Sequence, residues 1–296
     1  LICAFMMYSS LDSAGSFTAI LRLMDIGVNK GNEILNIKPM DIDGKDIVAP
    51  TYDISFENVD FSYEKRKIIN DLSFDIKQGT TTAIVGPSGG GKTTICRLMA
   101  RFWDVDKGVI KLGGIDVKDY SIDSLMKNFS FVFQNVYLFE DTIANNIRFG
   151  KPEASDEEVI EIAKKACCHE FIQKLPNGYN TIIGEGGSTL SGGEKQRISI
   201  ARAMMKDAPI IILDEATANV DPENEKELMS AIEELTRKKT IIMIAHRLKT
   251  VRNADKILVI DNGSIVQNGT HDELMKQDNI YRKFINAREL AVGWKI

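Results

Sequence analysis

Nine consecutive residues, Gly86 to Thr94, have the composition of a phosphate-binding loop, GPSGGGKTT. They follow an apolar run of β-forming residues at 80–85 and precede a predicted helix at 92–102. In such a loop glycines let backbone amides turn toward an anion, a lysine reaches the outer phosphates, and a hydroxyl binds Mg²⁺. The helix adds the positive end of its dipole. A glycine-rich turn is the alternative for this string taken alone. The expected nucleotide contacts are Gly86, Pro87, Ser88, Gly89, Gly90, Gly91, Lys92, Thr93 and Thr94.

A second apolar run, at 210–213, ends in the acidic pair Asp214 and Glu215. Strands buried on both faces of a parallel sheet have continuous aliphatic sequences of this kind. The carboxyl ends of such strands are where ligands bind in open α/β folds. We therefore expect Asp214 to hold Mg²⁺ opposite Thr93, and Glu215 to polarise the attacking water. The alternative, two solvated loop carboxylates, is weakened by the phosphate loop earlier in the chain.

A third motif, LSGGEKQR at 190–197, combines a serine and two glycines with an amphipathic stretch that extends to about Lys206. Ser191, Gly192 and Gly193 would open this helix and form a second anion-binding helix N-terminus. The chain therefore has two phosphate-binding ends but only one lysine-bearing loop.

Together the three motifs resemble the ATP-binding cassette (ABC) family over about residues 52–286. The resemblance implies an α/β fold: a P-loop NTPase core with a parallel sheet, an antiparallel β subdomain and an inserted α-helical subdomain. It also implies an ATPase that binds ATP and Mg²⁺. In that family the signature loop, here Ser191–Gly193, caps the γ-phosphate held by the other subunit, so a dimer around two ATP molecules is implied.

The resemblance extends to four further residues. Tyr63 resembles the aromatic residue that stacks on adenine, although a tyrosine at a strand edge also packs on its own sheet. Gln134 resembles the glutamine that contacts Mg²⁺ and the water. Asp221 resembles the aspartate that crosses the dimer interface, and it also suits an N-cap before Pro222. His246 resembles the switch histidine at the γ-phosphate. The expected catalytic set is Glu215, His246, Lys92 and Gln134, and the expected Mg²⁺ ligands are Thr93, Gln134 and Asp214.

One residue departs from the family pattern, because Glu194 stands where glutamine is usual. A carboxylate near the phosphates of a partner is unfavourable unless it points away along the helix. We expect a signature loop that still works, because Ser191, Gly192 and Gly193 are intact, but whose interaction with the partner's phosphates is altered by Glu194. The departure leaves a heterodimer open, although a homodimer is the favoured interpretation.

The composition agrees with an ATPase without identifying one. The chain has 296 residues, 44% of them hydrophobic and 27% charged, which is enough for a large core and a smaller lobe. A net charge of −5 argues against nucleic acid as a partner. The four cysteines lack metal-binding spacing and suit reduced cytosolic thiols.

The motifs require a particular set of elements. We expect antiparallel strands at 52–61, 68–76 and 109–112, and parallel strands that end at Val85, Phe133, Leu213, Ala245 and Ile260. Two sequences of the Ser/Thr-x-x-Glu type predict capping boxes, one at Ser155 and Glu158 and the other at Thr270 and Glu273.

The domain organisation predicted from the sequence has four parts. Residues 1–37 would be the end of a last transmembrane helix with its cytoplasmic extension, because about eleven apolar residues cannot cross a core that needs roughly twenty. A helix docking on the domain's own surface is the alternative. Residues 38–50 form a flexible linker, 51–290 the ABC ATPase domain and 291–296 a C-terminal tail.

Two segments, one of which resembles a segment typical of exporters in this family, imply an exporter. Its membrane and ATPase domains would share one polypeptide at the cytoplasmic face of the cell membrane. FEDTIANNI, at 139–147, would face a membrane domain, and TIIGEGG, at 181–187, would contact it through Glu185. A non-transport ABC ATPase of repair or translation is the alternative. It is disfavoured because the chain lacks long heptads between 94 and 190 and carries a single cassette. A GTP-binding switch would need an N-K-x-D motif, which is missing.

Overall fold

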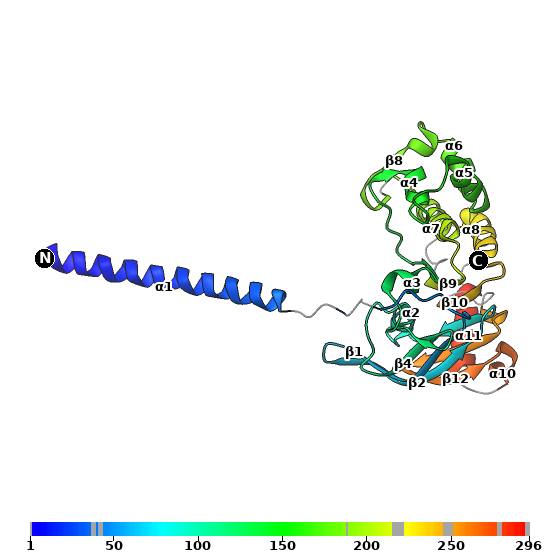
Figure 1. Cartoon of the computed structure of the whole chain (residues 1–296), viewed down its shortest axis with the longest axis horizontal. Helices are drawn as coiled ribbons and strands as arrows, with labels where there is room; N and C mark the ends of the chain where they lie inside the picture. The colour runs from blue at the N-terminus through cyan, green and yellow to red at the C-terminus, as the bar shows by residue number, and fades with distance from the viewer. Residues whose placement is uncertain are drawn as a thin grey trace. The chain divides into compact units, whose positions relative to one another are not determined.

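The computed structural model describes residues 2–36, 40, 44–187, 189–214, 222–244, 251–276 and 280–293 of the chain (Figure 1). They belong to two compact units, Leu1–Asp41 and Ile42–Ile296. The first unit is built on a single helix, α1 (Ile2–Leu35), whose large apolar side chains, such as those of Phe5 and Leu11, are exposed. Among the described residues, no helix combines the length and the apolar character that a membrane crossing requires.

The second unit contains a six-stranded central sheet with the order β12-β11-β3-β10-β9-β6. Its strands β11, β3, β10, β9 and β6 run parallel, and β12 pairs with β11 in an antiparallel hairpin. The predicted parallel sheet is therefore confirmed. Strand β6 ends one residue before the expected Phe133, and β9 and β11 end one residue after the expected Leu213 and Ile260; Ala245 lies outside the described residues. The strand bounds are β3 Thr81–Val85, β6 Phe129–Val132, β9 Ile210–Asp214, β10 Thr240–Ile244, β11 Lys256–Asp261 and β12 Ser264–Gly269.

Both faces of this sheet are buried, which explains its unbroken aliphatic strands. Successive residues of a strand point to opposite faces. In β9, Ile211 and Leu213 pack in one hydrophobic cluster with the helices that follow β6. Ile210 and Ile212 pack in another cluster with α2 (Lys92–Met99) and the second sheet.

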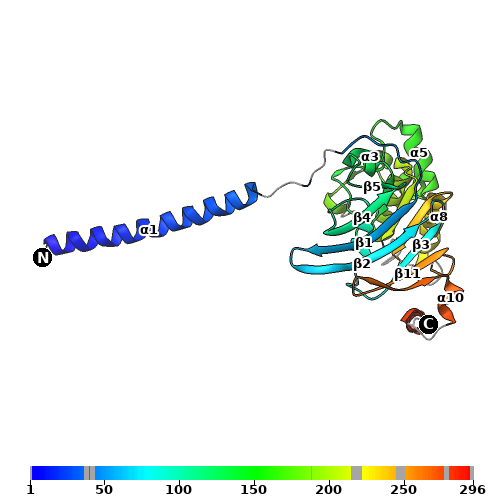
Figure 2. The same cartoon turned by 60° about the horizontal axis from the view of Figure 1, so that its bottom comes forward.

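The second sheet is antiparallel, with the order β2-β1-β4-β5 (Figure 2). Its strands are β1 (Ile54–Tyr63), β2 (Arg66–Ile76), β4 (Lys107–Leu112) and β5 (Ile115–Asp116), and α3 (Ile122–Met126) follows them. This confirms the predicted antiparallel subdomain. Helix α2 ends at Met99, three residues earlier than the predicted Phe102, because Arg101 has a positive φ of 54° and its Nε donates to Asp104 Oδ1 at 2.8 Å.

A helical lobe is inserted after β6, as predicted, and Figure 1 shows α4, α5 and α6 at the end of this unit opposite β1 and β2. Helix α7 follows the lobe and leads back to the central sheet through β9. The bounds are β7 Asp141–Thr142, α4 Ile143–Arg148, α5 Asp156–Lys165, α6 His169–Gln173, η1 Gly178–Asn180, β8 Ile182–Ile183, η2 Glu185–Gly187, α7 Gly192–Lys206, α8 Pro222–Thr236, α10 His271–Met275 and α11 Ile280–Gly293.

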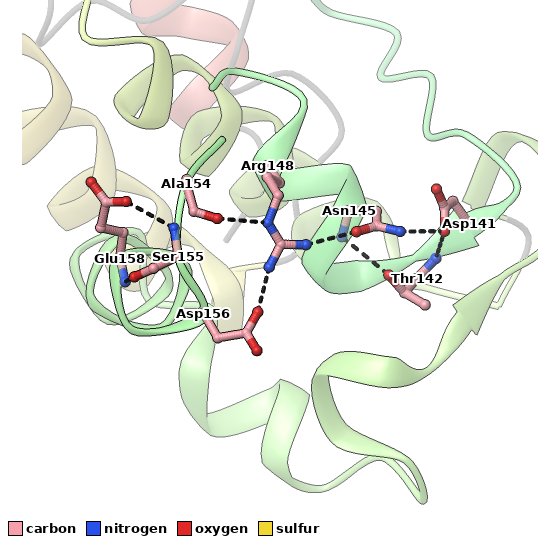
Figure 3. A network of polar contacts seen from close by, with 8 residues as sticks. All are labelled: Asp141, Thr142, Asn145, Arg148, Ala154, Ser155, Asp156 and Glu158. Atoms are coloured by element: carbon pink, nitrogen blue, oxygen red, sulfur yellow. Dashed lines mark hydrogen bonds and ion pairs between the residues drawn. The ribbon is translucent and has the colours of Figure 1, made fainter. Parts of the chain in front are cut away.

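Arg148 fastens α4 to the start of α5 (Figure 3). Its guanidinium donates to Asn145 Oδ1 at 2.7 Å and to the Ala154 carbonyl at 2.9 Å, and it also pairs with Asp156. Thr142 caps α4 by accepting from the Asn145 amide at 3.1 Å. Local hydrogen bonds therefore fix most of the 139–147 segment.

The second half of the predicted linker is bound to the domain. The Lys45 amide donates to the Asp119 carbonyl at 2.8 Å, and the Ser121 amide donates to the Lys45 carbonyl at 2.7 Å. Ser121 Oγ also donates to Asp46 Oδ1 at 2.6 Å, and Ala49 is buried. These bonds make residues 45–49 part of the second unit, in contrast to the flexible connection expected from their composition.

Candidate active site

The carboxyl ends of four neighbouring parallel strands lie at one edge of the central sheet. Their register aligns Ile84 with Ile244, Ile244 with Asp214, and Leu213 with Val132. The phosphate loop leaves this edge after β3, Asp214 is the last residue of β9, and Gln134 follows β6. Three motifs that are distant in the sequence are therefore brought to the position where open α/β sheets bind ligands.

The backbone of the phosphate loop requires glycine at two positions. Gly86 has a φ of 145°, and a Cβ atom there would lie 2.0 Å from the Ile260 carbonyl oxygen. Gly91 has a φ of 100° and is the N-cap of α2, where no side chain caps the helix. The first amides of α2 therefore have no capping side chain, which is the feature of an anion-binding helix N-terminus.

Lys92 lies across this loop. Its ammonium donates to the carbonyl oxygens of Gly86 at 3.1 Å and Pro87 at 2.8 Å, and the residue is only 8% exposed. Pro87, Ser88 and Gly89 are exposed at the tip. The buried Lys92 ammonium thus stabilises the conformation of the loop. An anion bound in the loop would interact favourably with this charge and with the dipole of α2.

Thr93 and Asp214 meet across the sheet edge. Thr93 Oγ1 donates to Asp214 Oδ1 at 3.5 Å, which joins the start of α2 to the end of β9. A hydroxyl and a carboxylate oxygen are ligands of the kind that Mg²⁺ prefers. The donor chemistry of this pair therefore fits Mg²⁺, as the sequence predicts. Thr94, the next residue, is buried against the core.

Gln134 is exposed two residues after β6, and a residue that sequence reasoning missed supports its segment. Gln196, on α7, is 5% exposed and donates from Nε2 to the Phe133 carbonyl at 3.2 Å. This hydrogen bond connects α7, the helix that begins at the signature loop, to the residue before Gln134. No local sequence pattern points to this contact, because it joins residues 63 positions apart in the chain.

The signature loop begins α7, and the predicted end of that helix at Lys206 is confirmed. Ser191 is the N-cap, with its Oγ accepting from the Glu194 amide at 3.3 Å. The side chain of Glu194 turns back to the cap, and its Oε2 accepts from the Ser191 amide at 2.8 Å. Ser191 and Gly192 are exposed, and Gly193 is buried. The loop therefore presents a fixed, outward-facing helix N-terminus.

Tyr63 lies at the end of β1 in an aromatic cluster that the sequence did not predict. Its ring meets Phe61 edge-on at 4.8 Å and Trp103 edge-on at 5.0 Å. The Arg97 guanidinium lies 6.0 Å from the Trp103 ring. Edge-to-face contacts of this type fix ring orientation. Trp103 thus helps to fix the orientation of the Tyr63 ring at the end of β1.

Three predicted residues, Glu215, Asp221 and His246, lie outside the described residues, as does the side chain of Glu185. The elements beside them are described. Strand β9 ends one residue before Glu215, α8 begins one residue after Asp221, and β10 ends two residues before His246. The roles of these residues remain predictions from the sequence.

Comparison with known proteins gives consistent results. A family model described as ABC transporter matches residues 69–218, just over half of the chain. The chain is 49% identical over 233 residues to an ATP-dependent lipid A-core flippase of Pasteurella multocida, covering 78% of this chain and 40% of that protein. It is 45% identical over 259 residues to the flippase of the same name from Haemophilus influenzae, covering 86% and 44%.

A solved structure of a bacterial Atm1-family ABC exporter with ATP bound is also similar. It superposes with a TM-score of 0.81 at 38% identity, over 90% of this chain and 47% of the exporter chain. The chain therefore spans less than half the length of each of these three proteins.

Proposed function

The chain belongs to the ABC transporter family, and from this premise we propose that it is the ATP-hydrolysing domain of an exporter. The observation that carries the proposal is the contact of Thr93 with Asp214 beside the Lys92 loop, in a chain that also presents the Ser191 helix N-terminus. One chain thus offers a complete phosphate loop and a second phosphate-binding end on another helix.

In the proposed reaction the protein acts by position and charge, as phosphoryl transfer requires. Lys92 and the loop amides bind the outer phosphates, and Tyr63 stacks on adenine. Thr93, Gln134 and Asp214 would hold Mg²⁺, which would neutralise phosphate charge when bound. Glu215 orients and polarises the water, and His246 contacts the γ-phosphate.

We propose that two chains act together, with Ser191–Gly193 of each capping the ATP held by the other and Asp221 at the interface. A homodimer is favoured because this chain supplies every predicted part of both half-sites. ATP would join the two domains, and hydrolysis would release them. The cycle would shift the attached membrane helices between two states.

A groove of about 380 Å³ supports contact with a membrane domain. Tyr137, Phe139 and Phe149 line it with exposed rings, at 55%, 42% and 63%. The Arg202 guanidinium lies 5.2 Å from the Phe139 ring and 5.7 Å from the Phe149 ring. Burial lowers the pKa of Arg202 to about 10, which leaves it charged at neutral pH. Exposed aromatic patches rimmed by charge mark protein contact sites.

We propose that the occupant of this groove is a cytoplasmic segment of a membrane domain in the same polypeptide. The relatives extend well beyond the matched region, since the alignments cover 40% and 44% of their lengths. On this proposal residues 1–37 end a transmembrane helix and 38–50 connect it to the domain, with residues 45–49 bound to the domain surface. Residues 51–290 form the ATPase domain and 291–296 its tail. The domain would work at the cytoplasmic face of the cell membrane.

The test is the ATPase rate of the purified chain against protein concentration at saturating ATP and Mg²⁺. A composite site predicts a rate that rises more steeply than linearly, because each site needs two chains. A strictly proportional rate would overturn the shared site. Activity that requires a different added subunit would overturn the homodimer.

A separate prediction concerns Trp103. Replacing it with alanine is expected to weaken ATP binding about three- to ten-fold, the size of one or two aromatic pair contacts, because Tyr63 loses its edge-on neighbour. Fluorescence titration with ATP and with tripolyphosphate measures the effect. The affinity for tripolyphosphate, which has no base, should stay unchanged, and Trp103→Phe should restore most of the ATP affinity. Equal losses for both ligands would contradict a role through adenine.

A further inference from the structure

Among the described residues of the second unit, three helices begin with a reciprocal capping box, in which the N-cap side chain and a glutamate bond each other's backbone amides. The box of α7 differs from that of α5 in its surroundings. Ser155 and Glu158 form the box of α5 (Figure 3), and Thr270 and Glu273 form that of α10. In the α5 box Lys151 donates to Glu158 Oε1 at 2.6 Å, so the carboxylate has a cationic partner. That box only stabilises its helix.

In the α7 box the carboxylate binds the donors that the signature loop would offer to a phosphate. Glu194 Oε2 accepts from the Ser191 amide at 2.8 Å and from the Ser191 hydroxyl at 2.8 Å. The Ser191 hydroxyl accepts in turn from the Glu194 amide at 3.3 Å. An internal anion therefore already occupies the hydrogen-bonding position at the tip of this helix.

Within the part of the chain that the structure describes, Glu194 forms no ion pair like the one between Glu158 and Lys151. Arg197, one turn along the helix, pairs with Glu227 at 3.1 Å and lies 5.2 Å from the Phe171 ring. Lys164 and Lys174 line the same cavity as Glu194 but form no ion pair with it. An incoming γ-phosphate would therefore meet a like charge, and the two would repel.

We propose that Glu194 is a positioning residue that competes with the γ-phosphate of the partner's ATP for the Ser191 donors, and so raises the protein concentration at which two domains close. This inference rests on the proposed function, because the competing phosphate is the one held by the other chain. Closure requires the Glu194 carboxylate to give up the Ser191 hydroxyl. The same carboxylate holds the loop in its helical form until then.

Glu194→Gln isolates the charge. An amide oxygen can accept the two bonds that Oε2 accepts, so the capping box persists while the negative charge disappears. The protein concentration at half-maximal ATPase rate is expected to fall about three- to twenty-fold, because one partly exposed charge interaction is worth a factor of a few and each dimer contains two such loops. ATP binding to dilute single chains should not change.

Two further measurements separate charge from structure. The difference between the wild-type chain and Glu194→Gln should shrink as salt is raised from 50 mM to 500 mM, since screening weakens the repulsion. Glu158→Gln removes the same carboxylate from the α5 box and should leave the half-maximal concentration unchanged. Glu194→Ala loses the capping box as well as the charge. It should also lower the protein concentration at half-maximal ATPase rate, and in addition it should lower the melting temperature.

The outcomes are distinguishable. A wild-type chain that neither binds ATP nor associates overturns the proposed function and this inference with it. A wild-type chain that does both, while Glu194→Gln has the same or a higher half-maximal concentration, overturns only the role of Glu194. A shift that is identical for Glu158→Gln, or that is independent of salt, also overturns it.

Discussion

Replacing Glu215 with glutamine is expected to lower steady-state ATP turnover by about 10²–10⁴-fold, the contribution typical of a general base, while ATP still binds. The glutamine keeps the shape of the side chain but cannot accept a proton from water. Asp214, the neighbouring residue, ends β9 beside Thr93, so the pair proposed to hold Mg²⁺ should remain intact. Phosphate release under saturating ATP measures the turnover, and equilibrium titration measures the binding.

The matched control is Glu233→Gln, an exposed carboxylate on α8 that has no proposed part in the reaction. It should leave both quantities unchanged. Glu215→Gln should also accumulate as an ATP-bound dimer, because the step that separates the two chains is blocked. Undiminished steady-state hydrolysis by this variant would rule out Glu215 as the base.

Replacing Lys92 with alanine is expected to weaken ATP binding by about 2–4 kcal/mol, roughly 30- to 1,000-fold, as for loss of a buried charged partner. The ammonium is the buried cation of the phosphate loop and also binds the Gly86 and Pro87 carbonyls. Its removal would therefore take away the proposed phosphate contact and also the two bonds that hold the loop. Isothermal titration with Mg²⁺ and ATP gives the affinity.

Lys151→Ala provides the comparison, since it removes an exposed, ion-paired lysine from the helical lobe. Its ATP affinity should match the wild-type value. Thermal unfolding without nucleotide shows whether Lys92→Ala remains folded, and added ATP should raise its melting temperature much less than that of the wild-type chain. Wild-type affinity in a folded Lys92→Ala chain would refute the assignment.

The parts of the site that are continuous in sequence could be predicted from the sequence. A continuous sequence of about ten residues is enough to predict each of three features: the phosphate loop, the β9 strand ending at Asp214, and the helix starting after Ser191. The capping boxes at Ser155 and Thr270 are equally local, and both are confirmed. Local hydrogen bonding and burial on both sheet faces determine all of these features.

The contacts that tie these parts together could not be predicted. Trp103 meets Tyr63, and Gln196 meets Phe133, across long stretches of chain, so each pair depends on how whole elements pack. The orientation of Glu194 was also open, because a carboxylate at that position can point along the helix or back to the cap. Its bonds to Ser191 settle the orientation.

The close approach of Gly86 to the Ile260 carbonyl has a consequence for how the domain is assembled. The phosphate loop rests on β11, and the Gly263 amide of the following turn donates to the Gly90 carbonyl at 3.3 Å. Strand β11 and the turn at Gly263, which come late in the chain, therefore support the phosphate loop, which comes early. During synthesis the GPSGGGKTT motif would emerge from the ribosome long before β11 and the Gly263 turn are made. We therefore expect the phosphate loop to be complete, and nucleotide binding to appear, only after synthesis has passed residue 263, which lies beyond the family-model match at 69–218.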